Sequence, residues 1–412
     1  MSLKDFQTIL VPSKKTGALQ FYHKPTKSIL EAAFSRPVIG VTSGAMVFDK
    51  NGNLIEKGED DPDWSFHDGV GCPRLMMRPQ RENTLHTFAE AGLTFLGDVV
   101  NPYGVSLRKY SINGGAQAQV RFGAAQLGTL TNGTRYLIKW FVQVINPAGS
   151  DRFRIESLST NVGVAATSWE FNGTLNAFGD VSDMEMIDIG DGHYELRAFW
   201  TPSAGDETPI ALDFQVQDGG SDPTAGGVFA FGGYMLIENG DPDDYIFTDG
   251  SNPLTRSANQ FTFNDLISKG VIGPGEGSMI LHPRNFRGVT TQGGVVVLGL
   301  NDGAILSGRG FGCAANTGSA RYYASLGSGS AFQFFRSPAE PVVYTWDAQG
   351  VKAYDVNGLV ASDPQTLPAS FNGFIGLSNG NTFELKPQDL AFTPFAITEA
   401  QAINAIREAQ NL

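Results

Sequence analysis

The stretch YLIKWFVQV, residues 136–144, decides the fold class. Large apolar side chains recur at every second position in it, namely at Tyr136, Ile138, Trp140, Val142 and Val144. Because a β-strand turns alternate side chains to opposite faces, this period predicts a strand with one buried face. Three later stretches repeat the pattern: DRFRIESL (151–158), YELRAFW (194–200) and IALDFQV (210–216). Such runs between Gly, Pro and Asp turns predict an antiparallel β-sandwich with one solvated face on each sheet.

The composition of the 412-residue chain agrees with an all-β fold. Glycine is frequent at 50 residues, phenylalanine reaches 29, and charged residues make up only 17%. Turns need glycine and pleated faces take aromatic rings, whereas long helices are richer in charged residues. The length predicts two or three domains with sizeable cores.

The charge and the terminal sequence restrict the partners. A net charge of −13 argues against sequence-independent binding of nucleic acid, which needs a basic surface. No apolar run approaches the length of a membrane span, and the N-terminus lacks the apolar centre of a signal peptide. Cys72 and Cys313 are too few for a disulfide framework or a cysteine zinc site. We therefore expect that the protein neither binds nucleic acid nor inserts into a membrane. We also expect that both cysteines are free thiols and that the protein is made in a reducing cytoplasm.

The pattern predicts two antiparallel sandwiches of jelly-roll or lectin-like type. The expected order is an arm (1–35), a hairpin and connector segment (36–100), a first sandwich (101–250), a linker (251–260) and a second sandwich (261–412). The arm is basic, which indicates either a solvated tail or an anchor onto an acidic partner. The lysines that would serve as the anchor are Lys14, Lys15, Lys24 and Lys27.

Turn and cap residues place three elements. The sequence DKNG at 49–52 lies between apolar alternations and predicts a β-hairpin. Two further turns, at 347–350 and 355–358, predict a three-stranded meander. Thr398 followed by Gln401 is a capping box, so the chain ends in a short helix whose apolar stripe packs on the second sandwich.

A search for chemistry finds no catalytic pattern. The five histidines show no ligand spacing, and neither a nucleophile elbow nor a phosphate loop is present. We therefore expect a protein that is not an enzyme and has no cofactor. Acidic clusters at 59–63, at 241–244 and between 180 and 191 could bind Ca²⁺, although solvated acidic loops are the default for so acidic a chain.

Three tryptophans are candidates for stacking on sugar rings. Trp64, Trp169 and Trp346 all lie near turns, where an aromatic ring can be exposed. Burial in a core is the competing interpretation for each of them.

Several stretches resemble one known family. They are FSRPVIGVTSGAMVFDKNGNLIE (34–56), CPRLMMRPQRENTL (72–85), MEMIDIGDGHYELRAFWTPSAG (184–205), GGYMLIENGDPDDYIFTDGSNPLTRSANQ (232–260), VVYTWDAQGVKAYDVNGLV (342–360) and LAFTPFAITEAQAINAI (390–406). In this order they resemble bacteriophage tail-fibre-like virion proteins. The domains implied are a carbohydrate-binding-module-like sandwich and a laminin-G or concanavalin-like sandwich.

The resemblance implies a structural protein of the virion, assembled in the bacterial host cytoplasm and commonly a homotrimer. As a tail fibre or receptor-binding protein it would attach to the host surface, through a glycan if the lectin-like domains bind sugar, and its arm would bind other virion proteins. One alternative is a capsid decoration or head-fibre protein on the major capsid protein, and another is a glycan-degrading tail enzyme. In the stretch 72–85, Arg78 and Arg81 would form ion pairs within or between protomers, and Asn83, which continues the family pattern, would be a third assembly residue.

Overall fold

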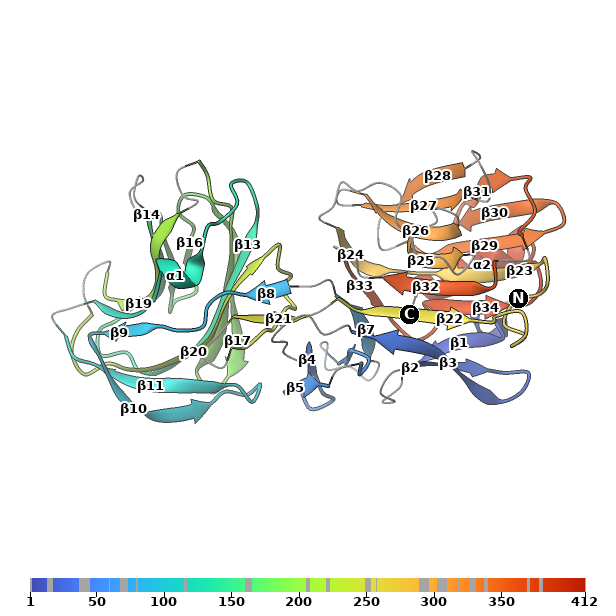
Figure 1. Ribbon diagram of the computed structural model, residues 1–412. Coiled ribbons are helices and arrows are strands. Elements are labelled where there is room, and N and C mark those ends of the chain that lie inside the picture. The colour runs from blue at the N-terminus through green and yellow to red at the C-terminus, as the bar shows by residue number, and fades with distance from the viewer. Residues whose placement is uncertain are drawn as a thin grey trace.

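A computed structural model shows two β-rich lobes side by side (Figure 1). It describes residues 2–12, 18–36, 45–58, 60–66, 73–78, 81–114, 117–159, 165–204, 208–219, 223–248, 253–256, 258–288, 296–301, 310–316, 319–325, 331–336, 340–368, 371–377 and 381–411. The sheets are built from antiparallel pairs, so the predicted all-β sandwich class is confirmed. None of the helices in these ranges is long and apolar enough to cross a membrane.

One lobe is built around a 14-stranded sheet whose ends, β28 and β31, approach each other, so that the sheet encloses a core. In spatial order its strands are β28 (Ala331–Arg336), β27 (Ser319–Ser325), β26 (Gly310–Asn316), β25 (Val296–Asn301), β32 (Gly373–Leu377), β22 (Gln260–Asn264), β3 (Ser28–Ser35), β2 (Ala18–His23), β1 (Thr8–Val11), β34 (Leu390–Thr393), β23 (Gly277–Leu281), β29 (Val342–Asp347), β30 (Gly350–Asp355) and β31 (Gly358–Asp363). The predicted meander is confirmed as β29–β30–β31.

Smaller elements complete this lobe. A four-stranded sheet contains β24 (Arg284–Gly288), β33 (Asn381–Leu385), β7 (Arg74–Met77) and β6 (Trp64–Ser65). The 3-10 helix η1 (Leu3–Asp5) packs beside helix α2 (Glu399–Gln410). The capping box of α2 is confirmed, because the Thr398 side chain accepts a hydrogen bond from the backbone N–H of Gln401.

The other lobe is a sandwich of two sheets. The first consists of β10 (Leu93–Val100), β11 (Ser106–Ile112), β20 (Val228–Glu238), β13 (Tyr136–Asn146), β18 (His193–Trp200) and β17 (Val181–Gly190), with β8 (Arg81–Asn83) and β21 (Leu254–Arg256) attached to it. The second consists of β16 (Leu175–Asn176), β15 (Ala165–Glu170), β14 (Arg152–Ser159), β19 (Pro209–Gln217), β12 (Ala118–Gly123) and β9 (Ala89–Ala91), and the short helix α1 (Ala124–Leu127) follows β12.

This second lobe is an insertion in the first. The chain leaves the first lobe after β7, which pairs with β33, and enters the other lobe at β8. It returns through β21, which pairs with β8, into β22. We call residues 81–256 the inserted lobe and residues 2–78 with 258–411 the split lobe. The predicted boundaries 36–100, 101–250, 251–260 and 261–412 are therefore wrong, because pairing between strands distant in sequence defines the lobes.

The predicted N-terminal arm is likewise wrong. Strands β1, β2 and β3 lie inside the 14-stranded sheet, between β34 and β22. Thr8 of β1 is paired with Phe392, at the other end of the chain. These three strands are thus part of a core, because their alternating apolar side chains fill it; Leu10, Leu19, Phe21 and Phe34 are buried.

The deciding strand β13 is buried on both faces. Ile138, Trp140 and Val142 point into the sandwich, as predicted. The opposite face was expected to be solvated, yet Leu137 and Phe141 are also buried there. The cover consists of residues 241–248 and of the hairpin β4 (Ala45–Phe48) and β5 (Leu54–Lys57), which comes from the split part of the chain.

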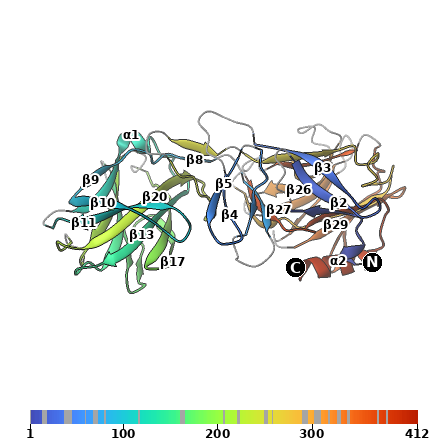
Figure 2. The same ribbon diagram turned by 90° about the horizontal axis from the view of Figure 1, so that it is seen from below.

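The hairpin that was predicted at 49–52 therefore joins the lobes. The Asp49 carboxylate accepts hydrogen bonds from the backbone N–H groups of Asn51 and Asn53, which confirms the turn. The Leu54 N–H donates to the Tyr103 carbonyl of the inserted lobe at 2.9 Å. Figure 2 shows β4 and β5 between the two lobes.

Candidate functional site

Asn83 anchors the connector where it enters the inserted lobe. Its side-chain amide is fully buried and donates to the carbonyl oxygens of Tyr234 and Ile246 at 3.0 and 2.8 Å. Its Oδ1 accepts from the N–H groups of Leu85 and Leu236. A side chain saturated in this way within one chain is a structural anchor, so its expected part in oligomer assembly has no basis in these contacts.

The two connector arginines also make contacts within the chain. Arg78 is 2% exposed, and its Nη1 donates to the Met46 carbonyl of the hairpin. Arg81 donates from Nε to the Asn239 carbonyl. Burial lowers the pKa of Arg81, and the nearby carboxylates of Asp244 and Asp241 oppose this shift. The structure therefore contradicts an intersubunit role for Arg78, whose guanidinium is not accessible to a second protomer.

Asn259 fixes the returning chain beside the outgoing one. Its backbone N–H donates to the Arg78 carbonyl, and its side chain donates to Asp63 Oδ2 and to the Met76 carbonyl. Asp63 is held in turn by Arg36 at 2.8 Å. Residues 73–78 and 81–85 thus lie where the chain passes from one lobe to the other.

The predicted stacking residues are all buried. Trp64 and Trp346 belong to the core of the split lobe, and Trp169 belongs to the core of the inserted lobe. Their exposed fractions are 5%, 1% and 0%. The prediction of sugar stacking by these rings is wrong, because all three residues lie in strands (β6, β15 and β29) and their side chains belong to the cores.

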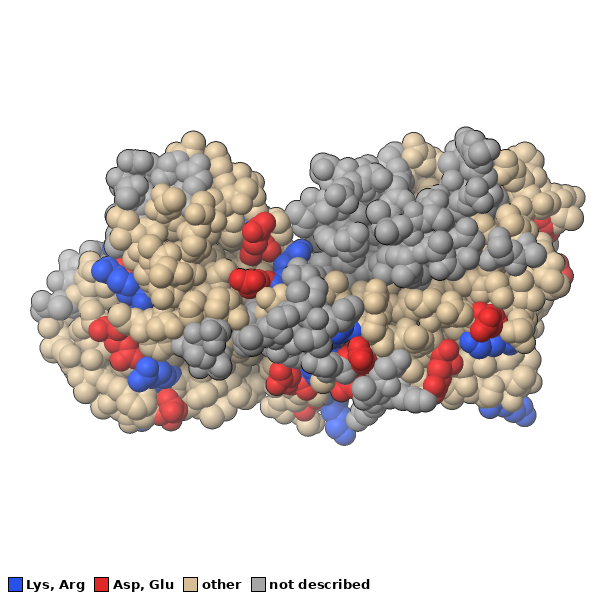
Figure 3. All heavy atoms as spheres, in the orientation of Figure 1, with Lys and Arg blue, Asp and Glu red and all other residues tan. Residues whose placement is uncertain are grey.

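The remaining predicted sites are the lysines of the arm and the acidic clusters. Lys24 and Lys27 lie at the turn between β2 and β3, while Lys14 and Lys15 are outside the described residues. On the face drawn in Figure 3, basic and acidic residues are interspersed. Within the described ranges no group of three or more His, Cys, Asp or Glu side chains is placed to hold a metal ion.

A pocket lies at the edge of β20, where this strand changes partners. Its first part pairs with β11 and its second part with β8. A bulge between these parts shifts the register against β13. Gly233 permits the bulge, because its φ is +59° and a Cβ there would lie 2.7 Å from the Phe141 ring.

The pocket has a volume of about 390 Å³, within the range typical of small-molecule sites. We call it the aromatic pocket. Its lining comes from the inserted lobe and from the hairpin: Met46, Leu54, Leu85, His86, Phe88, Gly104, Val105, Ser106, Arg108, Phe122, Phe231, Gly232, Gly233, Tyr234, Phe247 and Thr248.

Tyr234, which lines this pocket, has a buried hydroxyl group. The side chain is 8% exposed, and its hydroxyl is buried without a hydrogen-bond partner among the described residues. Burial raises its pKa well above the usual value, so the phenol is neutral at physiological pH. An unpaired buried hydroxyl costs about 1–3 kcal/mol, which a ligand that bonds to it would recover.

Arg108 and Glu90 form a donor and acceptor pair beside the pocket. Arg108 Nη1 lies 2.7 Å from Glu90 Oε1, and the guanidinium stands over the Phe95 ring at 4.6 Å. The Tyr110 hydroxyl donates to the same Glu90 oxygen. These contacts leave further guanidinium N–H groups and a second carboxylate oxygen, which match the vicinal hydroxyls of a sugar.

His86 adds an acceptor. Its Nδ1 lies 2.8 Å from the Thr84 carbonyl oxygen, which can only accept, so Nδ1 carries the proton. In the neutral ring Nε2 is then the acceptor. The arrangement therefore combines aromatic walls with hydrogen-bonding groups of both kinds.

Sequence reasoning missed these residues. Phe88, Arg108 and Tyr234 lie far apart in the chain and have no shared motif. The only local signal was the pair Gly232–Gly233 within a strand pattern, which indicates a bulge or a close approach.

Comparisons with known proteins add little. No protein-family model matches the chain. No curated protein matches it either.

Two solved structures show a weak likeness. One contains the CBM22-1 and GH10 modules of the Clostridium thermocellum endo-1,4-β-D-xylanase 10B complexed with xylohexaose, with 13% identity and a TM-score of 0.24 over 41% of this chain. The chain covers only 30% of that structure. The other comes from work on the promiscuous specificity of carbohydrate-binding modules of the β-sandwich superfamily, with 11% identity, a TM-score of 0.25, and coverage of 56% of this chain and 97% of that one. At these TM-scores the likeness carries no argument about function.

Proposed function

We propose that this chain is a glycan-binding attachment protein of a phage particle, and that its sugar site is the aromatic pocket of the inserted lobe. The observation that carries the proposal is the buried Tyr234 hydroxyl, unpartnered among the described residues, beside a pocket walled by aromatic rings. Sugars offer apolar ring faces and hydroxyl groups together, which is the combination that this lining would satisfy.

The phage context rests on the sequence resemblance of residues 34–406 to tail-fibre-like proteins. Attachment through weak sugar sites gains strength when several copies act together on one particle. The low affinity expected for one such pocket is therefore compatible with the proposed role.

The ligand class can be tested by saturation-transfer NMR with free hexoses, N-acetylhexosamines, uronic acids and oligosaccharides built from them. We expect transfer to at least one of these sugars, and its loss in Phe88→Ala, which removes a pocket wall. The control is Phe178→Ala, since Phe178 is 56% exposed and does not line the pocket. Absence of transfer for every sugar, or equal loss in both variants, would contradict the proposal.

The attachment role can be tested separately. Gold-labelled antibody against the inserted lobe should mark the tail of the phage particle. Labelling of the capsid would instead support a decoration protein. Release of reducing ends from bound polysaccharide would contradict a purely binding role.

A further inference from the structure

A second cavity lies next to the aromatic pocket. Its volume is about 340 Å³, and polar side chains contribute much of its lining. We call it the polar pocket. It is lined by Arg81, Glu82, Thr84, Leu127, Thr129, Leu130, Tyr136, Leu236, Glu238 and Asn239.

The two pockets lie on either side of one extended segment, residues 84–88. Thr84 lines the polar pocket, while its neighbour Leu85 lines the aromatic pocket. On β20, Leu236 lines the polar pocket and Tyr234 lines the aromatic pocket. These two residues are two positions apart on one face of the strand. Figure 1 shows the chain between β8 and β9 crossing the inserted lobe, with α1 on one side of it and β11 on the other. Consecutive Cα atoms are about 3.8 Å apart, so the walls of the two pockets are immediate neighbours.

Each pocket is lined by a residue whose buried hydroxyl has no hydrogen-bond partner among the described residues. In the aromatic pocket it belongs to Tyr234. In the polar pocket it belongs to Thr84, whose Oγ1 is buried and has no partner among the described residues. The Thr84 backbone N–H, by contrast, donates to the Leu236 carbonyl and holds the segment in place.

The rest of the polar pocket suits a hydroxyl-rich ligand. The carboxylates of Glu82 and Glu238 supply acceptors, and the Thr129 hydroxyl can both donate and accept. Its aromatic contribution is the Tyr136 ring alone, so it lacks the walls that hold a ring face. The two cavities thus offer different chemistry to adjacent parts of one ligand.

We infer that the two pockets are neighbouring subsites for a single oligosaccharide. One sugar ring lies against the aromatic walls beside Tyr234, and an adjoining unit of the same chain bonds to the polar pocket beside Thr84. The ligand class is therefore an oligosaccharide rather than a free monosaccharide. This inference rests on the proposed function, because it extends the same site.

The test compares monosaccharides with oligosaccharides built from them, by titration calorimetry on the full-length protein and on Thr84→Val. This substitution replaces the hydroxyl by a methyl group, so it keeps the shape of the side chain and removes its hydrogen-bonding capacity. We expect the wild-type protein to bind an oligosaccharide at least about tenfold more tightly than its monosaccharide. Thr84→Val should lose most of that advantage and leave monosaccharide affinity unchanged. Thermal unfolding of the variant should match the wild type, which separates a subsite effect from misfolding.

The possible outcomes distinguish a failure of the subsite inference from a failure of the proposed sugar-binding function. Equal affinity for both sugars, or an equal loss of both in Thr84→Val, would overturn the subsite inference and leave the aromatic pocket as a sugar site. Failure of every sugar to bind would overturn the proposed function and this inference with it.

Discussion

The Asn83 side chain donates a hydrogen bond to the Tyr234 carbonyl oxygen at 3.0 Å, across 151 positions of sequence. This contact fixes the first strand of the inserted lobe against β20 at the bulge that forms the aromatic pocket. The same Asn83 amide ties Ile246, Leu85 and Leu236 to this point. The connector that joins the lobes therefore also builds the candidate site.

Asn83→Ala should destabilise the inserted lobe. The substitution leaves buried backbone groups without partners, and we expect a loss of about 2–4 kcal/mol in the free energy of unfolding. Asn176→Ala is a matched control because Asn176 is exposed, and it should cost less than about 0.5 kcal/mol. Denaturant unfolding monitored by circular dichroism measures both, and equal stability of the two variants would refute the anchor.

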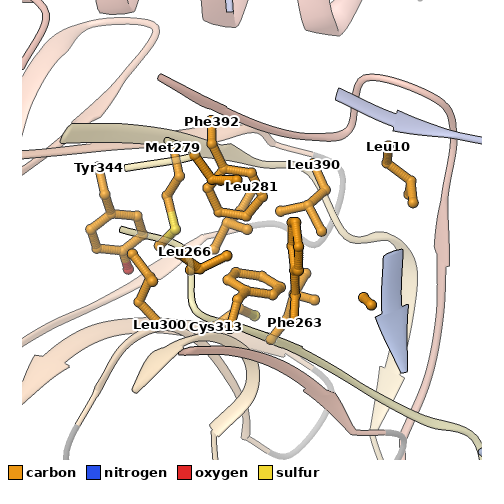
Figure 4. Packing of buried hydrophobic residues seen from close by; sticks show 14 of the residues in the cluster. Leu10, Phe263, Leu266, Met279, Leu281, Leu300, Cys313, Tyr344, Leu390 and Phe392 are labelled. Atoms are coloured by element: carbon orange, nitrogen blue, oxygen red, sulfur yellow. The ribbon is translucent and has the colours of Figure 1, made fainter. Parts of the chain in front are cut away.

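Removal of residues 2–35 should unfold the split lobe. These residues supply three strands between β34 and β22, and Leu10 lies in the core with Phe263 and Leu390 (Figure 4). The point substitution Leu10→Ala should cost about 2–5 kcal/mol, whereas exposed Leu175→Ala should be nearly neutral. A truncated chain that keeps the near-ultraviolet circular dichroism of the split lobe would show that these strands are dispensable.

Lys139 and Glu195 form a buried pair on the covered face of β13. Their Nζ and Oε1 atoms are 3.2 Å apart, and both side chains are nearly inaccessible. Lys139→Met removes the nearer cation of the buried Glu195 carboxylate and leaves only Arg197, whose Nη1 is 3.7 Å away, so we expect a loss of about 3 kcal/mol in stability. Asp183→Asn, which breaks the exposed pair with Arg135, should cost below about 1 kcal/mol. The prediction fails if chemical denaturation ranks the exposed pair above the buried one.

Buried tyrosines should make stability fall in alkaline solution. Burial raises the pKa of Tyr234, Tyr245 and Tyr344 well above the usual 10. Above pH 10 the unfolded chain releases these protons while the folded protein keeps them, so the free energy of unfolding decreases. Burial lowers the pKa of Lys139, and this shift makes the free energy of unfolding rise with pH instead. It is a single group, whereas three tyrosines act in the other direction. Ultraviolet titration should show several tyrosines that ionise only on unfolding; ionisation of all of them near pH 10 in the folded protein would contradict this.

Local features of the fold could be predicted from the sequence, and long-range ones could not. The alternation around Trp140, the turn at Asp49 and the cap at Thr398 are set by neighbouring residues, and all three are confirmed. The pairing of Thr8 with Phe392 depends on strands that meet only in the folded chain. Hence the N-terminal strands could be taken for an arm, and the insertion stayed hidden.

The candidate site was missed for the same reason. The pocket exists because two strands share one edge of β20, and neither β11 nor β8 shows this in its own sequence. Proximity to turns, used to select the tryptophans, predicts exposure poorly, because a strand residue close to a turn can still face the core, as all three do. The Gly232–Gly233 pair, which was not used in the sequence predictions, would have been the better guide, since it marks the bulge itself.

The most direct test of the account is titration calorimetry of sugars on Tyr234→Phe, paired with its thermal unfolding. Because the Tyr234 hydroxyl has no partner among the described residues, its removal should leave stability unchanged or raise it by about 1 kcal/mol. If that hydroxyl bonds to the ligand, sugar affinity should fall about tenfold or more. Unchanged sugar affinity in a stable Tyr234→Phe protein would contradict the assignment of the aromatic pocket as the binding site.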